Sequence, residues 1–246
     1  MRGRSNIILS TVNSDLLFAA PGASVPLKLR LSAQARAMRL RVDSRTGEVI
    51  LTIPRRVSRR KALSWAEEQR EWVEEALAAV PECIRLTPGG EIPLHGEPHI
   101  IAWSSQRSRT VTVQNGAILV GGPLEMLEAR LLRWLRRQAL EYLERDTRSF
   151  ALQAGVSVAR VGVGDPISRW GSCSSSGAIR YSWRLILAPD WVRRATVAHE
   201  VAHRVHMNHG PEFHALVERL LGADPRPARK WLRVNGARLA RIGPRR

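Results

Sequence analysis

The sequence predicts an α+β protein with a β-rich N-terminal portion and a helical C-terminal portion. In the first portion apolar residues alternate with polar ones between turn residues, which is typical of β-strands. In the second portion apolar residues recur at helical spacing over long stretches. Gly121-Gly122-Pro123 separates the two, because such a segment interrupts either kind of element. We therefore expect a flexible tail at 1–24, a β-rich portion with one helix at 25–122, and a helical portion at 123–246.

The tail resembles a signal peptide only weakly. Arginines and scattered apolar residues come first, but Asn13-Ser14-Asp15 interrupts the apolar run that such a peptide needs. No other run is apolar enough to span a bilayer. We therefore expect no membrane association.

The β-rich portion begins with alternating apolar residues from Val25 to Ile53. A turn at residues 44–47 divides this stretch, which predicts a β-hairpin or meander. Ser58 is a favourable N-cap for a helix expected to run to about Val80.

Residues 81–99 are rich in proline and glycine and are predicted to form a loop. His95 and His99 within it are expected to be surface residues, because Gly96 and Pro98 exclude a helix that would align them. Strands are expected at 100–103, 110–113 and 118–120, with Asn115-Gly116 as a two-residue hairpin turn.

The longest helical pattern runs from Leu124 to about Ala154, with Gly155 as its C-cap. Short strands are predicted at 156–163 and 179–184. The loop of small residues at 168–177 lacks the glycine spacing and the lysine of a P-loop, which excludes a phosphate cradle. Three further helices are expected, beginning at Pro189-Asp190, beginning at Pro211, and around Trp231.

Residues 199–203, His-Glu-Val-Ala-His, match the pattern H-E-x-x-H. On a helix, residues four apart lie on the same face, so His199 and His203 can bind one metal ion. Glu200 then lies beside the metal, where a carboxylate can accept a proton from water. Imidazole is a good ligand for Zn²⁺, and a catalytic zinc usually has three protein ligands plus water. The motif therefore predicts a zinc site with a third ligand downstream.

Three histidines are candidates for the third ligand. His209 lies between Asn208 and Gly210-Pro211, turn and helix-start residues that can bring it back under the first two histidines, and is preferred. His214 would reach the metal only if the next helix packed end-on. On a continued helix His206 would lie about 10 Å along the axis from His199, which is poor geometry for sharing one ion.

The cysteines do not indicate a disulfide framework. Cys83 and Cys173 are the only two, and they lie far apart in unlike contexts, so a reducing cytoplasm is the predicted location. We expect Cys173 to be a small buried residue under the motif helix rather than a nucleophile.

Two segments carry a resemblance to a known family: RWGSCSSSGAIRYSWRLILAP at 169–189 and HEVAHRVHMNHGPEFHALVERL at 199–220. They resemble the YgjP-like metal-dependent hydrolases, a group similar to the SprT-like zincin peptidases. The resemblance extends from about Val25 to about Leu239, so 25–240 can also form one YgjP-like unit. The chain departs from the family's pattern at Ser182, where asparagine is common, and at His214, where a large aromatic is common.

The resemblance implies a zincin-like metallopeptidase core, in which the H-E-x-x-H helix packs on a small mixed or antiparallel sheet. It implies Zn²⁺ on His199, His203 and His209, with Glu200 as general base. The predicted function is therefore a zinc-dependent metallopeptidase that hydrolyses peptide bonds in peptide or protein substrates with a metal-activated water.

Other parts of the site are predicted less specifically. Tyr181, Arg169 and Arg184 are candidates for stabilising the oxyanion. Glu212 or Glu218 is expected to accept hydrogen bonds from the histidine rings. The strand at 179–184 is expected to present an edge to an extended peptide, as in zincins.

The formal net charge of +17 predicts attraction to polyanions. Weak nucleic-acid association through the basic surface is compatible with it, and so is an arginine-rich solvated surface without a ligand. One alternative function is a basic nucleic-acid-associated module with a structural zinc, although structural sites usually have four ligands and prefer cysteine. A protease acting on DNA-bound proteins, as for some SprT-like relatives, is a second alternative. The oligomeric state is left unassigned.

Overall fold

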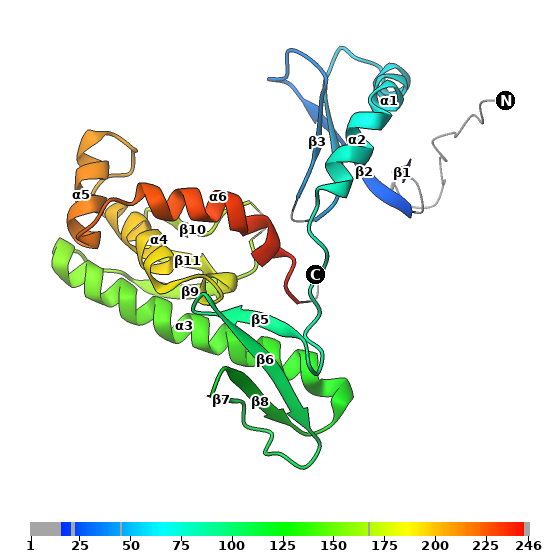
Figure 1. The fold of residues 1–246 in the computed structure, drawn as a ribbon. Coiled ribbons are helices and arrows are strands. Elements are labelled where there is room, and N and C mark those ends of the chain that lie inside the picture. Colours follow the sequence, from blue (N-terminus) through cyan, green and yellow to red (C-terminus); the bar gives the residue numbers. More distant parts are fainter. Residues whose placement is uncertain (1–15, 21–22, 45, 167, 244–246) are drawn as a thin grey trace. The chain divides into compact units, whose positions relative to one another are not determined.

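The computed structural model describes residues 16–20, 23–44, 46–166 and 168–243. The fold is mixed α+β, with small sheets and helices, as predicted (Figure 1). The chain divides between Glu82 and Cys83 into two compact units. None of the helices within the described ranges is long and apolar enough to cross a membrane.

The first unit contains a four-stranded sheet in the order β1-β2-β4-β3. Its strands are β1 (Leu16–Ala20), β2 (Ala23–Ser32), β3 (Arg39–Val42) and β4 (Val49–Pro54). The hairpin predicted across residues 44–47 is confirmed by the antiparallel β3–β4 pair. Strand β2 pairs with β4 in parallel, so the expected meander is wrong. The expected tail is wrong at 16–20 and 23–24, which form paired strands, and its residues 1–15 and 21–22 lie outside the described chain.

Two helices cover one face of this sheet where one was predicted. They are α1 (Arg59–Glu68) and α2 (Arg70–Ala78). Ser58 caps α1 as predicted, since its Oγ accepts a hydrogen bond from the Lys61 N–H at 3.3 Å. The N–H of Gln69 donates to the Ala66 carbonyl oxygen, a tightened last turn that ends α1. The core is formed by buried residues of both layers: Leu27, Val49, Leu51, Ile53, Ala62, Ala66 and Val73.

The second unit begins with a four-stranded sheet in the order β5-β6-β8-β7. Its strands are β5 (Glu91–Leu94), β6 (Glu97–Ser104), β7 (Thr112–Gln114) and β8 (Ala117–Gly121). The predicted loop at 81–99 is therefore wrong from Glu91 onward. His95 and Gly96 both have positive φ, 54° and 87°, which makes the tight turn of a hairpin. Asn115 and Gly116 form a similar turn, as predicted, with φ of 51° and 71°.

The long helix α3 (Leu127–Ala154) follows a short 3-10 turn, η1 (Leu124–Met126). Gly155 ends it with φ of 66°, which confirms the predicted left-handed C-cap. Ile101 and Ile118 of the sheet belong to the same buried cluster as Leu131 and Leu135 of α3. The predicted boundary at 122–123 therefore falls inside one core, and the division of the chain lies earlier.

A three-stranded sheet in the order β10-β11-β9 completes the framework of the site. Its strands are β9 (Arg160–Gly164), β10 (Gly171–Cys173) and β11 (Ala178–Ser182). The 3-10 turn η2 (Trp183–Ile186) begins where the strand predicted at 179–184 should have continued. Ser182 is buried and its Oγ accepts from the Arg184 N–H at 3.3 Å. Strand β11 is central, so the expected peptide-binding edge is not on β11.

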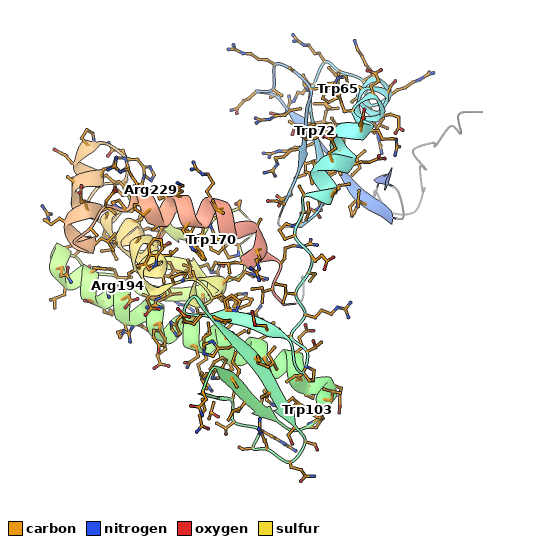
Figure 2. All side chains as sticks on the ribbon, viewed as in Figure 1. Trp65, Trp72, Trp103, Trp170, Arg194 and Arg229 are labelled. Atoms are coloured by element: carbon orange, nitrogen blue, oxygen red, sulfur yellow. The ribbon has the colours of Figure 1, made fainter. Side chains whose placement is uncertain are left out.

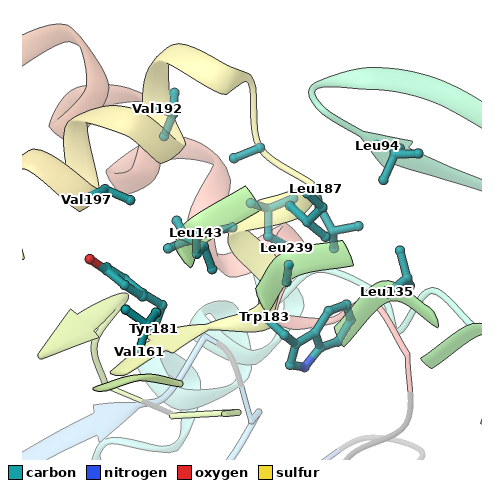
Figure 3. Close-up of a cluster of buried hydrophobic side chains, with 14 of the residues drawn as sticks. Leu94, Leu135, Leu143, Val161, Tyr181, Trp183, Leu187, Val192, Val197 and Leu239 are labelled. Atoms are coloured by element: carbon teal, nitrogen blue, oxygen red, sulfur yellow. The ribbon is translucent and has the colours of Figure 1, made fainter. Parts of the chain in front are cut away.

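The last three helices are α4 (Asp190–Ala202), α5 (Pro211–Leu221) and α6 (Arg226–Ala240). The first two begin at or near the predicted residues, and the third contains Trp231, as predicted. Helix α4 contacts α3, α5, α6 and β10. Figure 3 shows the apolar interior around it, where Val192 and Val197 of α4 lie among Leu143, Tyr181 and Leu239 from other elements.

The start of α4 is held by the β5–β6 turn. The His95 Nδ1 lies 2.7 Å from Asp190 Oδ1, and the His95 and Gly96 N–H groups donate to the carbonyl oxygens of Ile186 and Leu187. A Cβ on Gly96 would lie 2.7 Å from Pro189 Cγ, so this close approach needs glycine. His95 is thus half-buried and structural, and its expected surface position is wrong.

Candidate metal centre

Helix α4 carries His199, and His203 follows directly as its C-cap. Its Ala198, Val201 and Ala202 are buried, so the helix is fixed within the core. The helix ends at Ala202. A turn then leads to Pro211 at the start of α5, as the Asn208 and Gly210-Pro211 signals predict. This turn brings His209 back beside the helix.

The structure brings His199, His203 and His209 together. One ring nitrogen from each lies within 4.8 Å of the others, and the Nε2 atoms of His199 and His209 are 3.2 Å apart. Two nitrogens bound tetrahedrally to Zn²⁺ at 2.0–2.1 Å would be about 3.3 Å apart. Three imidazoles are suitable ligands for zinc, and the spacing of His199 and His209 matches this value.

Phe213 of α5 contacts all three histidine rings. Its side chain is fully buried, and its ring centroid lies 4.9, 4.6 and 4.7 Å from those of His199, His203 and His209. Sequence reasoning missed this role. The signal was an aromatic two residues after Pro211, which places it in the first turn of α5, next to the bend that carries His209.

Burial keeps the histidines of α4 in their metal-binding form. It lowers the pKa of His199 to about 3, with further lowering from His203 and His209. Burial also lowers the pKa of His203. Both imidazoles are therefore neutral at pH 7, with a lone pair for a metal.

The ring of His203 is oriented by a backbone group. Its Nδ1 lies 3.1 Å from the His206 carbonyl oxygen, and an N–H there leaves Nε2 for a metal. The acceptors predicted for the histidine rings were Glu212 and Glu218. Glu212 instead lies 3.7 Å from Nδ1 of His206.

His206 and His214 are not in the group of three. The backbone of His206 supports His203, as described above. The ring of His214 lies 6.5 Å from that of His209, and its Nδ1 lies 3.4 Å from an Arg229 nitrogen. Of the three downstream candidates, the structure brings His209 alone into the group found among the described residues.

Glu200 is buried between α4 and β10, with 6% of its surface exposed. A Cβ on Gly171 would lie 2.5 Å from Glu200 Oε1, so the carboxylate packs directly on that backbone. Burial raises the pKa of Glu200 to about 7, against an opposing effect of Arg169. A carboxyl group with this pKa can both accept and release a proton near neutral pH.

A hollow of about 310 Å³ opens beside these residues. His199, Glu200 and the exposed Arg169 and Arg229 line it. Its remaining lining is largely apolar: Trp170, Ala195, Val217, Pro225, Ala228 and Leu232. Figure 2 labels Arg229, which belongs to α6, and Trp170, which lies against α6 at Gly236. The hollow is large enough for a side chain of a bound ligand.

Two of the three predicted oxyanion candidates are engaged elsewhere. The Tyr181 hydroxyl is buried and lies 2.9 Å from Thr147 Oγ1. The buried guanidinium of Arg184 donates to Asp165 and to the carbonyl oxygens of Leu239 and Ile242. Arg169 remains at the hollow.

Cys173 lies in β10 and is half-buried, against an expectation of full burial. Burial raises the pKa of its thiol. A thiol with a raised pKa is a poor nucleophile at neutral pH, which agrees with a packing role.

The histidine group could hold a metal ion, and the mixed α+β fold is consistent with a metallopeptidase domain, a class that implies a bound metal. The model of the YgjP-like family, described as a metallopeptidase domain, matches residues 36–235, and the chain belongs to this family. The match extends over both compact units. Neither the curated proteins nor the solved structures include a match to this chain.

Proposed function

We propose that the protein is a zinc-dependent metallopeptidase with a zincin-like core. His199, His203 and His209 would hold the zinc, and Glu200 would be the general base. The observation that carries the proposal is the convergence of three imidazoles within 4.8 Å, beside a buried carboxylate. Three ligands with a carboxylate in the base position favour catalysis over a structural zinc, which usually has four ligands. Both cysteines are free, which supports the predicted cytoplasmic location.

The protein's own groups would then perform proton transfer. When bound, zinc would polarise the scissile carbonyl and acidify water. The Glu200 carboxylate would accept a proton from the attacking water and deliver it to the departing nitrogen. Arg169, at the same hollow, would stabilise negative charge on the carbonyl oxygen.

We further propose that the substrate binds as an extended peptide along β10. Among the described residues β10 pairs with β11 alone, so its other edge can form main-chain hydrogen bonds to a peptide. The largely apolar hollow beside Glu200 would accept an apolar side chain next to the scissile bond.

Replacing His209 by alanine tests the ligand set. The variant should lose bound zinc and peptide cleavage together, and its zinc affinity should fall by more than the roughly 10–100-fold typical of groups that only support a ligand. Zinc content after dialysis, measured by mass spectrometry, and cleavage of labelled casein are the two readouts.

Matched controls for this test are His206→Ala and His214→Ala, which should keep both zinc and cleavage. Loss of zinc in either control, with retention in His209→Ala, would assign the third ligand elsewhere. A wild-type protein that binds zinc but cleaves no peptide would contradict the peptidase proposal.

Gly171→Ala tests the placement of the base. Because the new Cβ would overlap the Glu200 carboxylate, the carboxylate must move, and a displacement of about 1 Å can reduce catalysis about 100-fold. We expect kcat to fall by about this factor with zinc content unchanged. Gly162→Ala is the control, because nothing lies within 4 Å of a Cβ there. Equal activity of the two variants would contradict the packing of Glu200 on β10.

A further inference from the structure

The sheet of the first unit has an open face that bears basic side chains. Along β2, β3 and β4 the residues alternate: Leu27, Val49 and Leu51 are buried against the helices, whereas Lys28, Arg30, Arg39 and Arg41 are exposed. In Figure 2, nitrogen-tipped side chains extend from β3, away from the helices that carry Trp65 and Trp72.

The strand register places these cations in two rows. Arg30 of β2 and Arg39 of β3 both lie opposite Thr52 of the central strand β4. Lys28 and Arg41 both lie opposite Ile50. Because neighbouring strands are about 4.8 Å apart, the two cations of one row lie about 10 Å apart at their Cα atoms.

Acidic residues neutralise only one of the rows. Lys28 pairs with Glu48 at 2.6 Å, and Arg41 pairs with Asp43 at 3.2 Å. Across the described part of the chain, neither Arg30 nor Arg39 forms an ion pair. Arg30 and Arg39, the row opposite Thr52, therefore carry positive charge that no described acidic residue neutralises. Like charges close together on a sheet are destabilising. An anionic ligand would relieve that repulsion.

The same face is concave. An open hollow of about 890 Å³ is lined by both rows and by Arg59, the first residue of α1. Arg59 also has no ion pair among the residues described, so it adds a third uncompensated charge at this end of the hollow. A hollow of this kind can hold a flexible strand, whereas a flat membrane surface would not reach into it.

We propose that Arg30, Thr52, Arg39 and Arg59 bind single-stranded nucleic acid through its phosphodiester backbone. Arginine donates bidentate hydrogen bonds to phosphate, and the Thr52 hydroxyl can donate to a phosphate oxygen. The phosphodiester backbone is the same for every base, so we expect this binding to be independent of sequence. The proposal is independent of the peptidase function, whose residues belong to the other unit.

The test uses the full-length protein and a labelled oligothymidylate of about 20 nucleotides, longer than most single-strand binding sites. Each phosphate contact contributes roughly 0.7 to the slope of log K against log salt for single strands. The variant R30Q/R39Q/R59Q should therefore reduce the slope by about 2 and weaken binding at low salt by about tenfold or more. R30K/R39K/R59K keeps the charge but loses the bidentate hydrogen bonds, so it should keep most of the salt slope and bind more weakly than the wild type.

The matched control is R133Q/R233Q/R238Q, which removes the same charge from exposed arginines of the second unit. It should leave the slope nearly unchanged. Equal effects of both glutamine variants would show that net charge alone drives binding and would overturn the proposal. It would also be overturned by no binding of the wild type, or by binding to phosphatidylserine vesicles without binding to the oligonucleotide.

Discussion

Glu200→Gln is expected to abolish peptide cleavage and to leave the zinc in place. Glutamine has nearly the same shape as glutamate and can occupy the same space over Gly171, so the packing of α4 on β10 should persist. It cannot accept the proton of the attacking water. Because general base catalysis is typically worth 10²–10⁴-fold, we expect kcat to fall by about this range or more.

The measurement compares zinc content and casein cleavage of the wild type and the variant. Glu212→Gln is a suitable control, because Glu212 has a side chain that is 85% exposed and lies near His206. The control should keep both properties. Loss of zinc from Glu200→Gln would identify Glu200 as a ligand and contradict its role as base, and retained turnover would contradict it as well.

Asp146→Ala is expected to destabilise the protein by up to about 3–5 kcal/mol, the cost typical of removing one partner of a buried ion pair, because Arg193 then keeps its pair with the exposed Asp190 but loses its buried partner. Asp146 Oδ2 lies 3.0 Å from Arg193 Nε, and both side chains are almost completely buried. Arg193 also donates to Asp190 at 2.5 Å. The pair therefore joins the middle of α3 to the first turn of α4.

Urea unfolding monitored by circular dichroism measures this loss. Glu144→Ala is the control on the same helix, because Glu144 forms an exposed ion pair with Arg148. Such pairs contribute about 0–1 kcal/mol. Asp146→Asn should be less harmful than Asp146→Ala, since the amide oxygen still accepts a hydrogen bond. Similar unfolding free energies for Asp146→Ala and Glu144→Ala would contradict the importance of the buried pair.

Several parts of the fold that follow from local signals were predicted correctly. Ser58 as N-cap, Asn115-Gly116 as a turn and Gly155 as a C-cap each act through their own backbone or neighbouring residues. The meeting of His209 with the motif histidines also follows from a local signal, the turn before Pro211. The ligand assignment itself remains a prediction.

The parts that depend on distant contacts were not predictable in this way. The parallel pairing of β2 with β4 is set by long-range strand order. His95 adopts a positive φ, which is uncommon for a residue other than glycine, and contacts near α4 hold its turn in place. The Asp146–Arg193 pair joins residues 47 apart in the chain. Neither hydrophobic periodicity nor turn chemistry reports such contacts.

The contacts of Phe213 with the three histidine rings bear on whether the protein needs a metal ion in order to fold. In small zinc modules the metal is needed for folding, so removing it unfolds the chain. Here Phe213 contacts all three histidine rings, and these contacts do not depend on a metal. Removal of the metal by a chelator should therefore leave the protein folded but inactive, and adding metal should restore activity. The concentration of free metal would then set the fraction of active molecules.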